Sequence, residues 1–425
     1  MLGATFLNSV DSSGETKDAS YIATVISAAI EKVGSDNIVQ VITDNAANCK
    51  AAWNLIKNKF PRIVCSPCAA HCLDLLLEDW GKLPISSVVE NVAEIVKFIN
   101  GHDGSLALLR HHSPNKGSLK PADTRFGTNV IMLERVVELK DVLQEMVASR
   151  KYKTWVQKRS LIAQSSQITK LLLSDNFWSK CELYIEINKP VYELLRLVDG
   201  QLPVIGKIYY RMFKIQEKIN NFPDITDAQR HELYQLFASR WSMMHTDLHS
   251  AGFLLDPEYV NMAQNTNEEV MNGFYKLVEK LFPDVQEQTA IANQLVAFRS
   301  SHGIFGRSVA KAAAATMPAY QWWQNFGASV PELQSFAVRI LSQTASSSEA
   351  ERNWSLFGFM SGKRRFRLKT STMEKMVFIH ANTRMMDKIT DVCYEEEHLD
   401  WEVDSPSQSQ SETESESGDI NDDPN

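Results

Sequence analysis

Residues 39–49, VQVITDNAANC, join a strand to a helix through one carboxylate, and this segment constrains the fold more than any other. Four β-branched residues between Val39 and Thr43 favour a buried strand. Asp44 follows directly, and an Asn- and Ala-rich turn then opens a helix. In open α/β sheets, ligands and catalytic groups gather at the carboxyl ends of the strands. Asp44 is therefore the first candidate site residue.

The residues around this segment alternate between predicted strands and helices, which indicates an α/β unit over residues 1–72. Residues 4–10, ATFLNSV, have the composition of a strand. A helix is expected over residues 18–33, where apolar side chains recur at helical spacing. A second helix runs to Pro61, and residues 62–66, RIVCS, are expected to form a third short strand.

Helical periodicities replace the α/β pattern beyond residue 72 and predict an all-helical region over residues 73–315. One of the clearest, residues 129–147, is expected to be a single helix. Residues 316–390 are expected to return to the core and to end in helices. There, the serines up to Ser348 precede the acidic EAER, so we expect an N-cap and a first helical turn that contains Glu349 and Glu351.

Charge and cysteine content exclude several classes of protein. Six cysteines in 425 residues are too few for a disulfide scaffold, so a reducing, intracellular setting is expected. No signal-peptide pattern and no long apolar run is present, so no membrane partner is expected. The chain has 52 acidic and 44 basic residues, but residues 395–425 hold 12 of the acidic and none of the basic ones. The remainder is mildly basic, and residues 391–425 are predicted to be a disordered acidic tail.

Asp44 and Glu351 lie far apart in the sequence, and both are candidates for metal-dependent phosphoryl transfer. Two-metal chemistry needs several carboxylates from separate elements, because Mg²⁺ and Mn²⁺ prefer oxygen ligands and must clamp the attacking and leaving oxygens. Most Asp and Glu residues are solvated surface groups. Spacing alone therefore does not distinguish this pair from solvated surface carboxylates.

Several separated motifs resemble the hAT transposase superfamily, particularly its plant members. The resemblance covers most of residues 1–390 in the family's order. The segments that carry it are VQVITDNAAN (39–48), PCAAHCLDLLLEDWGKL (67–83), TRFGTNVIML (124–133), LHSAGFLLDPEYV (248–260), PELQSFAVRILSQTASSSEAERNWSLF (331–357), KRRFRLK (363–369) and HANTRM (380–385).

The resemblance implies an RNase H-like core, interrupted by a large helical insertion and followed by C-terminal dimerisation helices. Such enzymes cut and join DNA with metal ions held by Asp, Asp and Glu. Asp44 matches the second Asp and Glu351 matches the Glu, whereas no residue of this sequence matches the first Asp, nor is the family's zinc finger found. We therefore expect an incomplete, N-terminally truncated core that does not cut DNA. Magnesium or manganese is expected only in an active form.

The resemblance also marks candidate DNA-binding residues. Cys68 and His71 match a family C-x-x-H pair beside the active site, while the spacings in CSPCAAHC, residues 65–72, also permit a zinc site or plain helix packing. Arg125 matches a family arginine near the DNA, and Phe126 replaces the family's tryptophan with a smaller stacking ring.

Three further predictions concern residues from His249 onwards. The basic run KRRFRLK, with Lys363, Arg364, Arg365 and Arg367, is a candidate phosphate contact or nuclear localisation signal, with a solvated basic face as the alternative. His249 and the tryptophans Trp322, Trp323 and Trp354 are assigned to packing. A dimerisation face is expected from the helical spacing of Met373, Met376, Val377 and His380.

Three hypotheses follow for function. The first is a transposase-derived nuclear protein that forms a homodimer and binds DNA without cutting it. The second is an active transposase fragment that cleaves and transfers DNA strands with divalent metal ions. The third is a structural interaction protein without a nucleic-acid role. The first accounts best for the two matched carboxylates and the mildly basic body of the chain.

Overall fold

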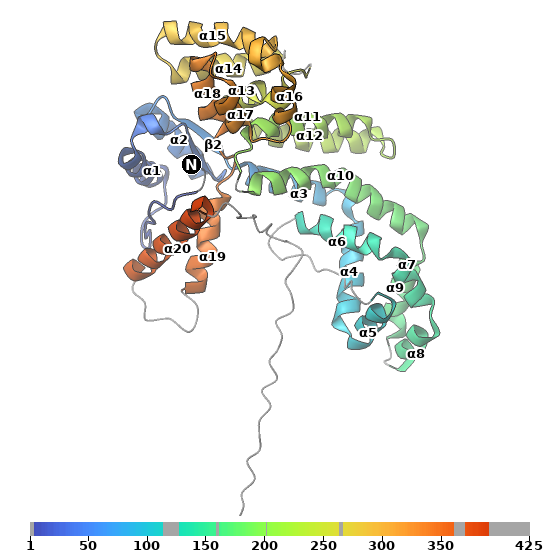
Figure 1. Ribbon diagram of the computed structural model, residues 1–425. Coiled ribbons are helices and arrows are strands. Elements are labelled where there is room, and N and C mark those ends of the chain that lie inside the picture. Colours follow the sequence, from blue (N-terminus) through green and yellow to red (C-terminus); the bar gives the residue numbers. More distant parts are fainter. Residues whose placement is uncertain are drawn as a thin grey trace, which may run out of the picture. The chain divides into compact units, whose positions relative to one another are not determined.

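The computed structural model describes residues 4–113, 127–158, 161–200, 202–262, 267–360 and 370–390. This part of the chain is mostly helical, with one two-stranded parallel sheet (Figure 1). The described residues belong to one compact unit, residues 1–392. The acidic tail predicted for residues 391–425 lies outside the described residues.

From residue 18 to residue 67, the helices and strands are those expected from the sequence. They are α1 (Ala19–Val33), the 3₁₀ turn η1 (Ser35–Asn37), β1 (Gln40–Thr43), α2 (Ala47–Lys59) and β2 (Val64–Pro67). Asp18 caps α1 by accepting a hydrogen bond from Tyr21 N at 2.8 Å. Gly34 ends α1 with a φ of 91°, and its N–H donates to Ile30 O at 2.8 Å. The α/β alternation predicted for this region is therefore present.

The sheet separates two apolar cores. β1 and β2 are parallel and in register from Gln40 opposite Val64 to Thr43 opposite Pro67. Val41 and Cys65 pack into the core formed with α1 and α2, whereas Val64 packs into a larger core on the other face. That larger core includes α3 (Ala69–Gly81), which directly follows β2.

A group of helices after α3 has a core of its own. They are α4 (Val88–Gly101), α5 (Asp103–His112), α6 (Gly127–Glu138), α7 (Lys140–Ala148), α8 (Arg150–Lys158), α9 (Ile162–Leu172) and α10 (Asp175–Asp199), with the 3₁₀ turn η2 (Pro84–Ser86) leading into α4. Buried residues from Val88 to Tyr192 form this core. The last part of α10, from Ile187, instead joins the larger core beside the sheet.

The helices that follow α10, as far as α18, pack with that larger core. They are α11 (Ile205–Asn221), α12 (Asp227–Met244), α13 (Asp247–Leu255), α14 (Glu268–Leu281), α15 (Val285–Arg299), α16 (Ser308–Ala314), α17 (Ala319–Phe326) and α18 (Pro331–Leu341), with the 3₁₀ turns η3 (Pro257–Tyr259) and η5 (Gly303–Gly306). All residues of α13 from Leu248 to Leu255 are buried. His249 is among them, which confirms its assignment to packing.

Two helices end the described chain, α19 (Ser348–Met360) and α20 (Thr370–Thr390), and they pack side by side (Figure 1). Glu349 and Glu351 lie in the first turn of α19, as predicted. Acidic side chains there favour the helix, because they interact with its positive N-terminal dipole.

Residues 4–10 do not form the predicted strand. They have no regular secondary structure, and their contacts are with α19 and α20. The side chain of Asn382 accepts a hydrogen bond from Phe6 N at 2.9 Å and donates one to Phe6 O at 3.0 Å. The strand composition was therefore misleading, because a side-chain amide satisfies the backbone groups that a neighbouring strand would have paired.

The predicted helix over residues 129–147 is also divided. α6 and α7 are separated by Leu139, whose φ of −96° and ψ of 7° depart from helical values. Leu139 is itself buried in the core of the α4–α10 group, so the break directs an apolar side chain inward. No described residue tests the predicted boundaries at 72, 315 and 390, and they stay predictions.

Candidate functional site

Asp44 lies directly after β1, at the carboxyl end of the sheet, with its side chain exposed. Its Oδ1 accepts a hydrogen bond from Ala46 N at 3.1 Å, which closes the turn before α2. α2 itself begins without a side-chain N-cap. Asp44 therefore fixes the turn. Its carboxylate faces solvent at the carboxyl end of β1, the position expected from the sequence.

The thiol of Cys49 lies against the Asp44 carboxylate, on the first turns of α2. Burial and the hydrogen bond and charge of Asp44 raise the pKa of Cys49 to about 11. The thiol is therefore protonated near neutral pH and serves as a hydrogen-bond donor to the carboxylate.

The start of α3 connects this turn to the C-terminal region. Asn45 Nδ2 donates to Cys72 Sγ at 2.9 Å, from the residue that follows Asp44. One helical turn earlier, Cys68 Sγ accepts a hydrogen bond from Ser347 N at 3.4 Å. Ala69 N also donates to the backbone oxygen of residue 345 at 2.9 Å. The β2–α3 junction therefore joins β1 to the segment before α19.

Glu351 lies on α19 just beyond that junction, with its side chain exposed. Ser347 Oγ donates to Glu351 Oε1 at 3.0 Å, which orients the carboxylate at the start of the helix. The next residue, Arg352, hydrogen-bonds the backbone oxygen of Asp199 at the end of α10 and pairs with Glu349. Three elements distant in sequence thus meet at the N-terminus of α19.

The elements that carry Asp44 and Glu351 are therefore linked by two contacts at the start of α3, one helical turn apart. Asn45 reaches Cys72 from the Asp44 side, and Ser347 reaches Cys68 from the Glu351 side. No group of three His, Cys, Asp or Glu side chains suited to a metal ion occurs within the described ranges. The magnesium or manganese expected for an active form stays a prediction.

The predicted DNA-binding residues divide into two groups. Cys68 is buried and His71 is exposed on the first turn of α3. Cys65, Cys68, His71 and Cys72 are not brought together as a metal site in the described part of the chain. The other candidates lie outside the described residues: Arg125, Phe126, Lys363, Arg364, Arg365 and Arg367.

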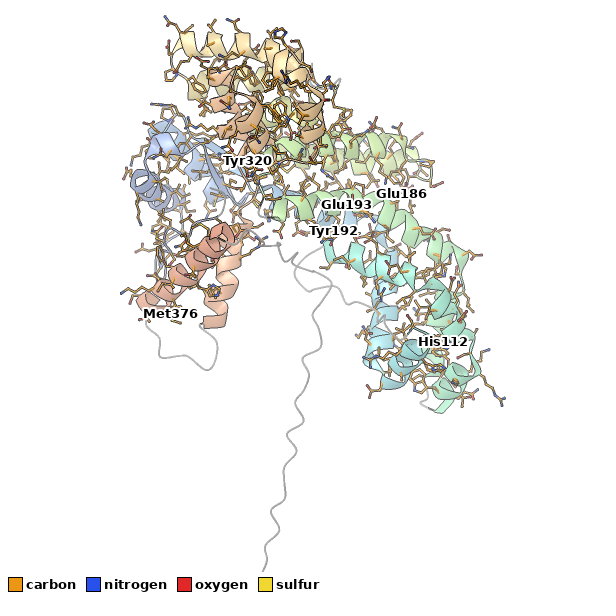
Figure 2. The ribbon with its side chains drawn as sticks, viewed as in Figure 1. His112, Glu186, Tyr192, Glu193, Tyr320 and Met376 are labelled. Carbon is orange, nitrogen blue, oxygen red and sulfur yellow. The ribbon has the colours of Figure 1, made fainter. Side chains whose placement is uncertain are left out.

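The predicted dimerisation residues lie on α20. Val377 is fully buried, His380 is exposed, and Met373 and Met376 are intermediate (Figure 2 labels Met376). The large apolar side chains that α20 exposes are instead Phe378 (46% exposed), Ile379 (63%) and Met386 (51%).

The assignment of all three tryptophans to packing is wrong for one of them. Trp322 and Trp323 are buried and donate hydrogen bonds to backbone oxygens through their indole nitrogens. Trp354, on α19, is 73% exposed. Tryptophan is usually buried, and that tendency led to the wrong prediction for Trp354. Which side chains of α19 are exposed depends on how α19 packs against α20, which the local sequence does not show.

Sequence reasoning missed three residues of this region: Asn45, Cys49 and Arg352. Asn45 and Cys49 flank the Asp44 turn, and Arg352 directly follows Glu351. Proximity to the two predicted carboxylates was the available signal. Their partners, Cys72 and Asp199, are set by the tertiary fold and left no local pattern.

Two family models match parts of the chain. Residues 303–383 match the hAT family C-terminal dimerisation region, which spans η5 to most of α20. Residues 1–96 match a domain of unknown function, DUF659, which covers β1, β2 and Asp44. Together, these two matches support an hAT-family, transposase-derived protein. A search of curated proteins finds no match.

The hAT match includes Glu351 and the exposed side chains of Trp354, Phe378 and Ile379, whereas Met386 lies just beyond it. Self-association through the C-terminal part of the chain is therefore supported. Among the described residues, no helix is long and apolar enough to cross a membrane.

Proposed function

We propose that this hAT-family chain is a transposase-derived nuclear protein that forms a homodimer through α19 and α20 and binds DNA without cutting it. The observation that carries the proposal is the overlap between the matched dimerisation region and the exposed apolar side chains of α19 and α20. The hAT C-terminal dimerisation region, residues 303–383, includes α19, on which Trp354 is exposed, and the part of α20 on which Ile379 is exposed. Met386 lies on the same helix, three residues beyond the matched region.

The exposed apolar side chains form the proposed contact surface on α20. Ile379 and Met386 are seven residues apart and therefore lie on one helical face, two turns from each other. Val377 is buried within the chain, so the opposite side of α20 already has its packing partners. A cluster of large apolar side chains that remains exposed favours a protein partner. We take that partner to be a second copy of this chain, because the matched family region is a dimerisation region.

Two glutamate substitutions test this surface. In Ile379→Glu with Met386→Glu, charges replace the apolar contacts, and burying them unpaired in an interface is costly. Sedimentation velocity at micromolar concentration should give a dimer for the unmodified chain and a monomer for this variant. The matched control is Val285→Glu with Val296→Glu, on the exposed surface of α15, which should remain dimeric. A folded double variant of α20 that stays dimeric would exclude this surface.

An RNase H-like core is the arrangement that best explains the site. β1, α2 and β2 form a parallel β-α-β unit, with Asp44 after its first strand and α19 attached at its carboxyl end through Cys68. Ligands bind at that edge of open α/β sheets. His71 is exposed at the start of α3 beside the same edge, where it is available to DNA. The nuclear location follows from a DNA partner and from the basic run KRRFRLK.

The lack of cutting rests on the number of matched carboxylates. Resemblance to the family assigns Asp44 and Glu351 but no third acid, and two carboxylates hold a pair of divalent ions poorly. The chain with Mn²⁺ and a transposon-end duplex should bind the DNA and give no cleavage product. A product that disappears in Asp44→Asn would instead establish the active transposase, and no DNA binding at low salt would leave only the structural interaction protein.

A further inference from the structure

A cationic surface lies at the junction of α5 and α8, far in sequence from the candidate site. The C-terminal end of α5 carries basic side chains, and so does the N-terminal end of α8, which lies beside it (Figure 1). We define the α5–α8 patch by these residues: Arg110, His111, His112, Arg150, Lys151 and Lys153. All are exposed except His112, which is half-buried (labelled in Figure 2).

Aromatic packing fixes α8 against its neighbours. The indole of Trp155 lies over Gly104 of α5, where a Cβ would be 2.0 Å from Trp155 Nε1. Trp155 also contacts Phe98 of α4 edge-on, with ring centroids 6.0 Å apart. Tyr152 is buried. Because one face of α8 is held by these rings, the charged residues between them are directed outward from a rigid base.

The patch has little compensating negative charge. Lys151 Nζ donates to His111 Nε2 at 3.3 Å, so two basic groups meet across the two helices. Within the described ranges, its one ion pair joins His112 Nδ1 to the carboxylate of Glu145 at 3.9 Å. The first turn of α8 contains basic and no acidic residues. That is the reverse of the arrangement that the helix dipole favours, so the charges weaken α8 rather than stabilise it.

We propose that the α5–α8 patch binds the phosphate backbone of duplex DNA, and the proposal rests on the DNA binding proposed above. Arg and Lys side chains from two rigid elements match the requirements of a repeating phosphate ligand, which needs cations at several points rather than one closed pocket. The phosphates supply the negative charge that the patch lacks. Contacts of this kind position the duplex without reading its sequence, and they add to the contacts made near His71.

The direct test neutralises the three cations of α8. The variant Arg150→Gln, Lys151→Gln, Lys153→Gln keeps the aromatic side of the helix. The control Lys170→Gln, Lys180→Gln, Lys276→Gln removes the same charge from three exposed lysines elsewhere that have no ion pair among the described residues. Affinity for a mixed-sequence duplex is measured for each full chain between about 50 and 200 mM salt.

The α8 variant should bind more weakly. The magnitude of its slope of log K against log salt should fall by about 2 to 3, because a complex with three fewer phosphate contacts releases fewer counterions. The control should keep the slope of the unmodified chain. Circular dichroism and dimer mass should be unchanged in both. If the unmodified chain binds DNA and the α8 variant has the same slope, the patch is not a DNA contact and the proposed function stands. If the unmodified chain does not bind, both proposals are wrong.

Discussion

Asn382 holds Phe6 through two hydrogen bonds that join opposite ends of the described chain. The amide oxygen accepts from Phe6 N at 2.9 Å, and the amide nitrogen donates to Phe6 O at 3.0 Å. The Phe6 ring also contacts Phe357 of α19 and Phe378 of α20, with ring centroids 6.4 and 6.3 Å apart. Residues 4–10 therefore brace the two helices of the proposed dimer surface.

The first prediction removes that brace. Asn382→Ala leaves both backbone groups of Phe6 without their partner and should weaken the local structure by about 1–3 kcal/mol. Hydrogen exchange should become faster in residues 4–10 and α20 and should stay unchanged in α11 and α13. Thr383→Ala, on the exposed neighbour, is the control and should leave the exchange as it is. Equal exchange in the two variants would show that the Asn382 contact does not hold the segment.

The outcome for residues 4–10 shows where prediction from the sequence failed. α1, β1, α2 and β2 were predictable because their periodicities and their caps, such as Asp18, are local. Residues 4–10 have a local strand pattern, but their partner Asn382 is more than 370 residues away. Asp44 and Glu351 stay predictions as site residues, and the Cys68 and Cys72 contacts that link their elements could not be predicted because they depend on tertiary structure.

The second prediction concerns close packing between α11 and α13. A Cβ on Gly206 would lie 2.7 Å from Asp256 Oδ2 and 3.0 Å from Gly252 O. Gly206→Ala should therefore lower the free energy of unfolding by about 1–3 kcal/mol through overpacking. Gly81→Ala is the matched control, since nothing lies within 4 Å of its Cβ. Urea unfolding compares the two, and equal midpoints would contradict the close approach of these helices.

The third prediction is a pH dependence from His249. Burial first, and then the charge of His245, lower the pKa of His249 from 6.5 to about 3. The unfolded chain therefore takes up this proton at a higher pH than the folded chain. Stability is fully present above about pH 6.5 and should fall below it by up to about 1.4 kcal/mol per pH unit.

Substitution identifies the group responsible. His249→Gln has no titrating ring, so its unfolding free energy should change less between neutral pH and about pH 5 than that of the unmodified chain. His231→Gln removes an exposed histidine and should keep the original dependence. An unchanged slope in His249→Gln would mean that another group causes the loss.

The fourth prediction tests the contact between Asp44 and Cys49. Burial and the Asp44 carboxylate raise the pKa of Cys49 to about 11. Asp44→Asn removes the negative charge, so this pKa should fall and alkylation of Cys49 at mildly alkaline pH should become faster. Mass spectrometry should show no change at Cys181, which is buried elsewhere. Glu90→Gln, an exposed acid on α4, should leave Cys49 unaltered, and the same rate in both variants would refute the contact.

A fifth prediction concerns the acidic residues of the C-terminal tail. Residues 395–425 carry 12 acidic and no basic side chains, so we expect them to reduce the affinity of the proposed basic DNA contacts. Deleting residues 395–425 should increase the affinity for duplex DNA at low salt, and the gain should shrink as salt screens the charges. Equal affinities with and without the tail would contradict this expectation.

Homodimer formation is the central claim, and light scattering on the unmodified chain tests it most directly. A stable interface of about 1,200–2,000 Å² should hold two copies together at micromolar concentration. We predict a molar mass twice that of the single chain, unchanged on dilution through the low-micromolar range. A mass equal to one chain at every concentration would contradict the account.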